Sequence, residues 1–120
     1  MSYNRADGRY VYTEPAPGVA SAARTTSGNG SSVDSGSAIV VRGLTVAVTA
    51  FSGTSPTLDV RLEHSHDNSS WSTVGSFAQK TGVASETKFF SGLDKFVRIA
   101  WTVGGTTPSF TFSVSGGELV

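Results

Sequence analysis

The fold is decided by one stretch of the chain, residues 44–63, which reads LTVAVTAFSGTSPTLDVRLE. Apolar side chains alternate with small or polar ones on both sides of its centre, which is the pattern of half-buried strands. In the centre, Gly53 tolerates a positive φ and Pro56 cannot continue a hydrogen-bonded ladder. The pattern predicts that the two halves pair as a β-hairpin, with residues 52–56 as its turn.

The same device returns near the C-terminus, where the strand-like residues 97–103 and 110–114 flank a second turn segment. Residues 53–58 read GTSPTL and residues 105–110 read GTTPSF. Two interpretations stay open at this point. The likeness reflects either the shared chemistry of unrelated turns or two related hairpins, one contributing to each sheet.

Shorter strand patterns complete the domain at residues 38–41, 71–77 and 86–91. Together they give about seven to eight strands, separated by turn residues at the spacing of a β-sandwich or small barrel. The sequence therefore predicts an all-β protein, with an antiparallel β-sandwich or jelly-roll-like domain over residues 38–120.

Residues 1–37 differ from the rest because they are poor in large aliphatic side chains and show no sustained period. Such a segment cannot bury enough apolar area to fold alone. We expect an extended N-terminal arm, with residues 26–32 as a flexible linker and residues 9–13 as a strand that adds to a partner's sheet. The candidate partner-binding side chains are Tyr3, Arg9, Tyr10, Val11 and Tyr12.

The composition narrows the range of functions. Nine basic and nine acidic residues cancel, so the electrostatic attraction that dominates nucleic-acid binding is missing, and we expect no nucleic-acid partner. The chain contains no cysteine, which excludes disulfides and thiolate metal sites. No stretch approaches the roughly 18 apolar residues of a membrane span, so we expect no membrane partner either.

Candidates for catalysis and metal binding are few. His64 and His66 would share one face of a strand and could hold a metal with Asp67, but the ordinary interpretation is one strand-end and one turn histidine. Asp59 and Glu63 alternate with an arginine, which is typical of a solvated strand face. We therefore expect a protein that is not an enzyme, with no catalytic, metal-binding or cofactor-binding residues and no cofactor.

The aromatic residues allow two interpretations. Trp71, Trp101 and the seven phenylalanines could form a platform on which sugars stack. Most of them fall on the inward phase of their strands, which favours packing in the core.

Part of the chain resembles small structural proteins of tailed bacteriophages. The resemblance spans about residues 39–115 and rests on three segments. In the first, a strand ending in serine leads through an aspartate-containing turn to a tryptophan; the second is a Phe-Val-Arg strand. The segments are SGTSPTLDVRLEHSHDNSSW at 52–71, Phe96-Val97-Arg98, and GGTTPSFTFSV at 104–114.

This resemblance implies a virion component, most directly a decoration (cement) protein on the capsid surface that is made in the host cytoplasm. Its implied partner is the major capsid protein or another virion protein, and such proteins often form homo-oligomers, with a trimer as the expected form. The alternatives are a neck, tail or fibre-associated structural protein, or a carbohydrate-binding adhesin module.

Overall fold

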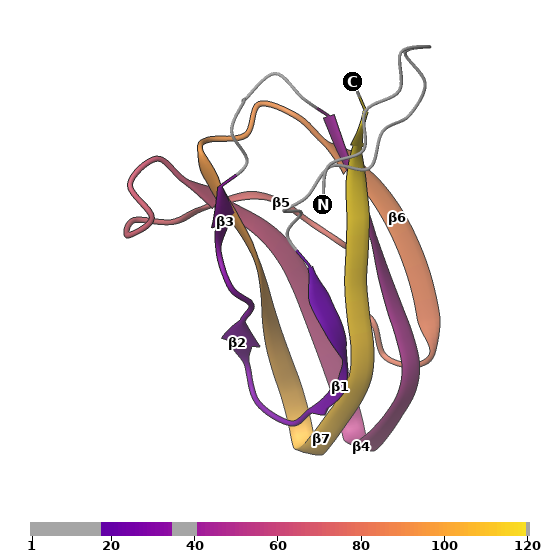
Figure 1. Ribbon diagram of the computed structural model, residues 1–120. Helices are drawn as coiled ribbons and strands as arrows, with labels where there is room; N and C mark the ends of the chain where they lie inside the picture. The colour runs from indigo at the N-terminus through magenta and orange to yellow at the C-terminus, as the bar shows by residue number, and fades with distance from the viewer. Residues whose placement is uncertain (1–17, 35–40, 120) are drawn as a thin grey trace.

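The computed structural model describes residues 18–34 and 41–119, and these residues form an all-β, antiparallel structure without a helix (Figure 1). No helix in this part of the chain is therefore available to cross a membrane. The seven strands are β1 (Val19–Arg24), β2 (Gly28–Asn29), β3 (Val33–Asp34), β4 (Val41–Ser65), β5 (Ser72–Ser76), β6 (Ala84–Phe90) and β7 (Phe96–Leu119).

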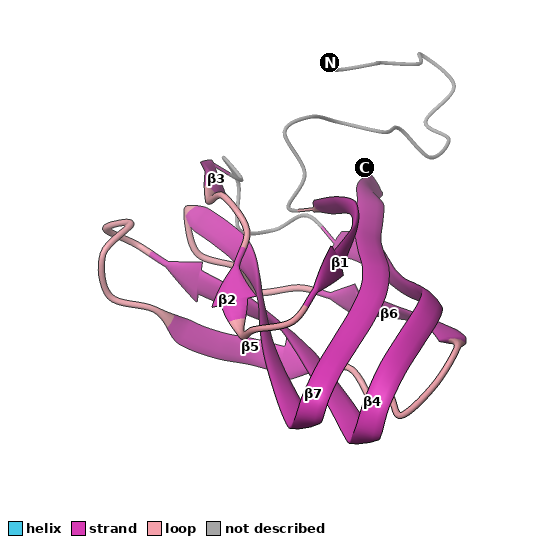
Figure 2. Cartoon of the chain, turned by 90° about the horizontal axis from the view of Figure 1, so that it is seen from below, coloured by secondary structure: helices cyan, strands magenta, loops and turns pink. Residues whose placement is uncertain are grey.

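The two long strands, β4 and β7, belong to both layers of the sandwich. They pair with each other along almost their whole lengths and bend together halfway, as the two V shapes in Figure 2 show. The first half of β4 also pairs with β6, and the second half with β5. β1 pairs with the second half of β7, and β2 and β3 pair with its first half. The β-sandwich is thus one continuous sheet folded over on itself.

The bends are formed by the two repeated segments found in the sequence. Thr54 pairs with Thr106 between them, so that each bend lies against the other. Gly53 has a φ of 112° and Gly105 a φ of 110°, a backbone region that other residues rarely adopt. A Cβ atom on Gly53 would lie 2.7 Å from the Thr107 carbonyl oxygen, and one on Gly105 would lie 2.8 Å from that of Ser55. The two corners are therefore packed reciprocally, backbone against backbone.

This arrangement corrects the two predicted hairpins. Residues 44–50 and 58–63 are successive parts of one strand, and they pair with β7, β6 and β5 rather than with each other. The same is true of residues 97–103 and 110–114 within β7. The predicted alternation of side chains is confirmed, because both halves of each folded strand turn their apolar faces toward the same interior.

The core lies between the two layers and draws on every long element. Alternate residues of β4 and β7 supply most of it, while Phe77, Phe90, Leu93 and Val19 close its margins. Trp101 packs edge-on against Phe112, with ring centroids 5.6 Å apart. The fully buried side chains include Leu44, Val46, Leu58, Val60, Leu62, Val97, Ile99, Phe110 and Phe112. The strands predicted at 71–77 and 86–91 are confirmed as β5 and β6.

The described part of the predicted arm and linker belongs to this fold. Residues 18–34 run antiparallel along β7, with Ala22 opposite Phe112, Gly28 opposite Trp101 and Val33 opposite Val97. The flexible-linker interpretation of residues 26–32 is therefore wrong, and the sheet extends well before the predicted boundary at residue 37. The edge of β7 offers backbone donors and acceptors that a polar segment can satisfy without a core of its own.

Hydrogen bonds and ring contacts with β7 hold this segment in place. The indole Nε1 of Trp101 donates to the Thr26 carbonyl at 3.1 Å, and the Val103 amide donates to Ser27 Oγ at 2.9 Å. Arg24 places its guanidinium over the rings of Trp101 and Phe112. The predicted partner-binding residues Tyr3, Arg9, Tyr10, Val11 and Tyr12 lie outside the described residues.

Replacing Gly53 by alanine tests the corner. We expect Gly53→Ala to lower the free energy of unfolding by about 2 kcal/mol or more, because the added Cβ meets backbone atoms at a strained φ. Gly92→Ala is the matched control, since Gly92 has a φ of 69° but nothing within 4 Å of an added Cβ. It should cost only about 1 kcal/mol. Urea denaturation measures both; equal losses would show that the contact between the corners does not constrain the fold.

Candidate functional site

The most organised polar cluster lies on the outer face of the layer that contains the second half of β4, the first half of β7 and β5. Leu58, Val60 and Leu62 point into the core, so the alternate residues of this part of β4 point outward. The register of β4 with β7 sets Arg98 directly opposite Glu63. Arg61 occupies the next outward position on β4. We call Arg61, Glu63, Arg98 and Trp71 the arginine cluster.

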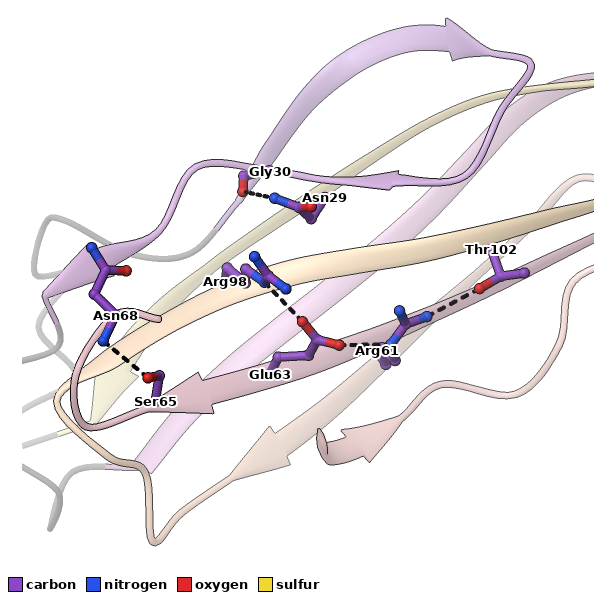
Figure 3. Close-up of polar contacts among 8 residues, drawn as sticks. All are labelled: Asn29, Gly30, Arg61, Glu63, Ser65, Asn68, Arg98 and Thr102. Atoms are coloured by element: carbon purple, nitrogen blue, oxygen red, sulfur yellow. Dashed lines mark hydrogen bonds and ion pairs between the residues drawn. The ribbon is translucent and has the colours of Figure 1, made fainter. Parts of the chain in front are cut away.

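Glu63 lies between the two arginines, as Figure 3 shows. Its Oε1 accepts a hydrogen bond from Arg98 Nε at 2.8 Å, and its Oε2 accepts one from Arg61 Nε at 3.0 Å. The Glu63 side chain is 10% exposed, against 24% for Arg98 and 32% for Arg61. The carboxylate is therefore covered by the two guanidinium groups that it holds, and the cluster carries one net positive charge.

The terminal nitrogens of the two arginines make fewer hydrogen bonds to described residues than their Nε atoms do. Arg61 Nη1 donates to Thr102 Oγ1 at 3.1 Å. The Arg98 guanidinium carbon lies 4.2 Å from the ring centroid of Trp71, which is a cation–π contact. Among the described residues, Nη1 and Nη2 of Arg98 have no hydrogen-bond acceptor. The site thus presents guanidinium groups that are fixed at Nε and open at their ends.

The pKa of Glu63 reflects the balance between its burial and the charges of the two arginines. Burial alone would raise the pKa of this carboxyl group, but the hydrogen bonds and charges of Arg98 and Arg61 outweigh it and bring the pKa below its ordinary value. Glu63 is therefore ionised throughout the neutral pH range. Its constant negative charge holds the two arginines side by side, where they would otherwise repel each other.

A loop at the end of β4 leads the chain to Trp71. The buried Ser65 donates from Oγ to Asp67 Oδ1 at 2.8 Å and accepts from the Asn68 amide at 2.9 Å. Asp67 Oδ1 also accepts from the amides of Ser69 and Ser70. These bonds lower the pKa of Asp67 to about 2. They fix a compact turn, which returns the chain to the outer face where Trp71 covers Arg98.

The other residues considered from the sequence are separated. His64, near the end of β4, accepts at Nδ1 from the Asp94 amide at 3.1 Å, while His66 lies exposed in the turn. No group of three or more histidine, cysteine or acidic side chains in the described residues could hold a metal ion. Asp59 accepts hydrogen bonds from Gln79 Nε2.

The predicted solvated strand face is wrong for Glu63, because the paired arginines leave this residue only 8% exposed. Its partner Arg98 lies 35 residues along the chain, so no local pattern could reveal the pair. Core packing is confirmed for Trp101, whereas Trp71 lies on the outer face, half-buried against Arg98.

Acid should weaken the fold through these carboxyl groups. The folded-state pKa of Glu63 lies below its unfolded value of about 4.3, so the stability it contributes is full above that pH and is lost as pH falls through the folded pKa. We expect Glu63→Gln to cost about 1–3 kcal/mol at pH 7 and to flatten the loss of stability on acidification below about pH 5.

Asp67→Asn is the comparison for this experiment. It should remove the part of the pH dependence that extends from about pH 4 down to about pH 2, the pKa of Asp67. Denaturation midpoints measured from pH 7 to pH 2 test both variants. If the denaturation midpoint falls as steeply below pH 5 in Glu63→Gln as in the unsubstituted protein, the assigned ion pairs are wrong.

Comparisons with known proteins give little further information. No protein-family model and no curated protein matches the sequence. Among solved structures, the chain is similar to a carbohydrate-binding module in complex with calcium and xylotriose. The TM-score is 0.34 at 14% sequence identity, over 91% of this chain and 75% of that chain.

Proposed function

We propose that the protein is a non-enzymatic virion component, a decoration protein that binds the major capsid protein and stabilises its lattice. The observation that carries this proposal is the arginine cluster. Tryptophan and arginine are the side chains that most often dominate binding between proteins, especially where they are held rigidly on a well-packed surface. Here the Nε atoms of both arginines are fixed by one carboxylate, and Trp71 stacks on one of them.

The same geometry favours binding over catalysis. A catalytic carboxylate must reach the proton that it transfers or the atom that it attacks. Each oxygen of Glu63 instead accepts from an arginine that remains charged at every pH of interest. Both oxygens of Glu63, the most buried acidic group described on the outer face, are therefore used to hold arginine side chains in place.

The proposal also draws on the resemblance of residues 39–115 to structural proteins of tailed bacteriophages. A neck, tail or fibre-associated protein would use the same kind of interface. The target surface distinguishes these locations, because a decoration protein binds assembled heads and a tail protein does not.

Carbohydrate binding is the second candidate, favoured by the outward position of Trp71, which is half-buried against Arg98. One ring face of Trp71 is covered by the Arg98 guanidinium, so that face is not open to a sugar ring. Binding of a neutral oligosaccharide such as xylotriose, with perturbation of Trp71, would favour this candidate.

Binding to heads assembled without the protein tests the main proposal. We expect the full chain to co-sediment with such heads to a saturating, fixed stoichiometry and to raise the temperature at which they release DNA. Tails purified from the same particle are the control. Binding to tails but not to heads would place the protein elsewhere in the virion, and binding to neither would remove the virion role.

A deletion of residues 1–17 tests the predicted arm separately. Because β1 begins at Val19, we expect the truncated chain to retain its denaturation midpoint while its affinity for heads falls by about tenfold or more. Replacing Tyr10 and Tyr12 together by alanine in the full chain should reproduce much of the loss. Unchanged affinity in both variants would exclude these residues from the interface.

A further inference from the structure

The arginine cluster has one positive charge more than its carboxylate neutralises. We infer that it is a carboxylate-binding site, formed by Arg98, Arg61 and Trp71, which takes an aspartate or glutamate side chain from a partner protein. The inference deepens the proposed function and rests on it, since it names the chemistry of the partner surface.

The geometry of Arg98 points to a carboxylate. Its Nε is already bonded to Glu63, and Nη1 and Nη2 have no acceptor among the described residues. A guanidinium binds carboxylate oxygens through two parallel N–H groups, and the pair formed by the two terminal nitrogens remains open here. Arg61 lies on the other side of Glu63, with its Nη1 on Thr102, and adds a second positive charge.

The site is organised before the partner arrives. Long arginine side chains usually lose conformational entropy when they bind, which reduces affinity. Here Glu63 holds both Nε atoms, and the ring of Trp71 lies 4.2 Å from the Arg98 guanidinium carbon. Much of the ordering is therefore complete in the free protein.

The size of the charge favours an isolated acidic side chain over a polyanion. The cluster carries one net positive charge and the whole chain carries none, whereas nucleic acids bind to surfaces that neutralise several phosphates. An acidic sugar would bring a carboxylate too, but the ring face of Trp71 toward Arg98 is already covered. A single carboxylate from a protein surface neutralises the cluster completely.

Nuclear magnetic resonance of the ¹⁵N-labelled full chain tests this, because its two tryptophans give two indole signals. The probes are hexaglutamate, trigalacturonate and a short DNA duplex, each titrated at low ionic strength. We expect hexaglutamate to shift the Trp71 indole and the Arg98 Nε signals. The Trp101 indole, which is buried and bonded to Thr26, should not move and serves as the internal control.

The variants separate a specific site from general charge attraction. Arg98→Gln should weaken hexaglutamate binding by about tenfold or more, and Arg98→Lys, which keeps the charge but loses the fork, by a smaller factor. Lys88→Gln is the matched control, since it removes the same charge from β6, where the Lys88 ammonium donates to the Ser76 carbonyl rather than to Glu63, and it should leave binding unchanged. The dispersion of the remaining signals confirms that each variant is folded.

Equal losses in Arg98→Gln and Lys88→Gln would overturn the inference, as would stronger binding of trigalacturonate or DNA than of hexaglutamate. The proposed function fails separately. If the chain binds heads and Arg98→Gln binds them equally well, the decoration role stands and the carboxylate site falls. If the chain binds no heads but hexaglutamate binding depends on Arg98, the site stands without that role.

Discussion

The close approach of two backbone corners is the constraint on which the structure depends. Gly53 and Gly105 each lie against the opposite corner at distances that leave no room for a side chain. The contact lies where β4 and β7 bend together, with Thr54 opposite Thr106 and a register shift on either side of that pair. The bend places the two halves of each strand in different layers, so the shared core and the register of the outer face depend on it.

The arginine cluster is one product of that register. Beyond the corner, β4 and β7 pair with Glu63 opposite Arg98, which brings together charges from distant parts of the chain. The neighbouring turn, held by Ser65 and Asp67, then delivers Trp71 to the same place. The cluster therefore lies on a backbone ladder and beside a turn whose amides bond to the side chains of Ser65 and Asp67.

The sequence predicted the fold class, the positions of most strands and the inward phase of their side chains, because alternation is a local signal. It did not predict which strands pair, since glycine and proline mark a corner and a hairpin turn equally well. The edge strands in residues 18–34 could not be predicted, because they are formed by pairing with β7 and show no alternating pattern of apolar side chains. The burial of Glu63 could not be predicted for the same reason, since it comes from Arg98, across the sheet.

The continuity of β4 and β7 through both layers has a mechanical consequence. In a sandwich of two separate sheets, only side-chain contacts and loops resist a force that pulls the layers apart. Here such a force would act on two unbroken peptide backbones that are joined by hydrogen bonds on both sides of the bend. The load would be spread along a ladder strained in shear, in which many bonds must break together before the molecule opens.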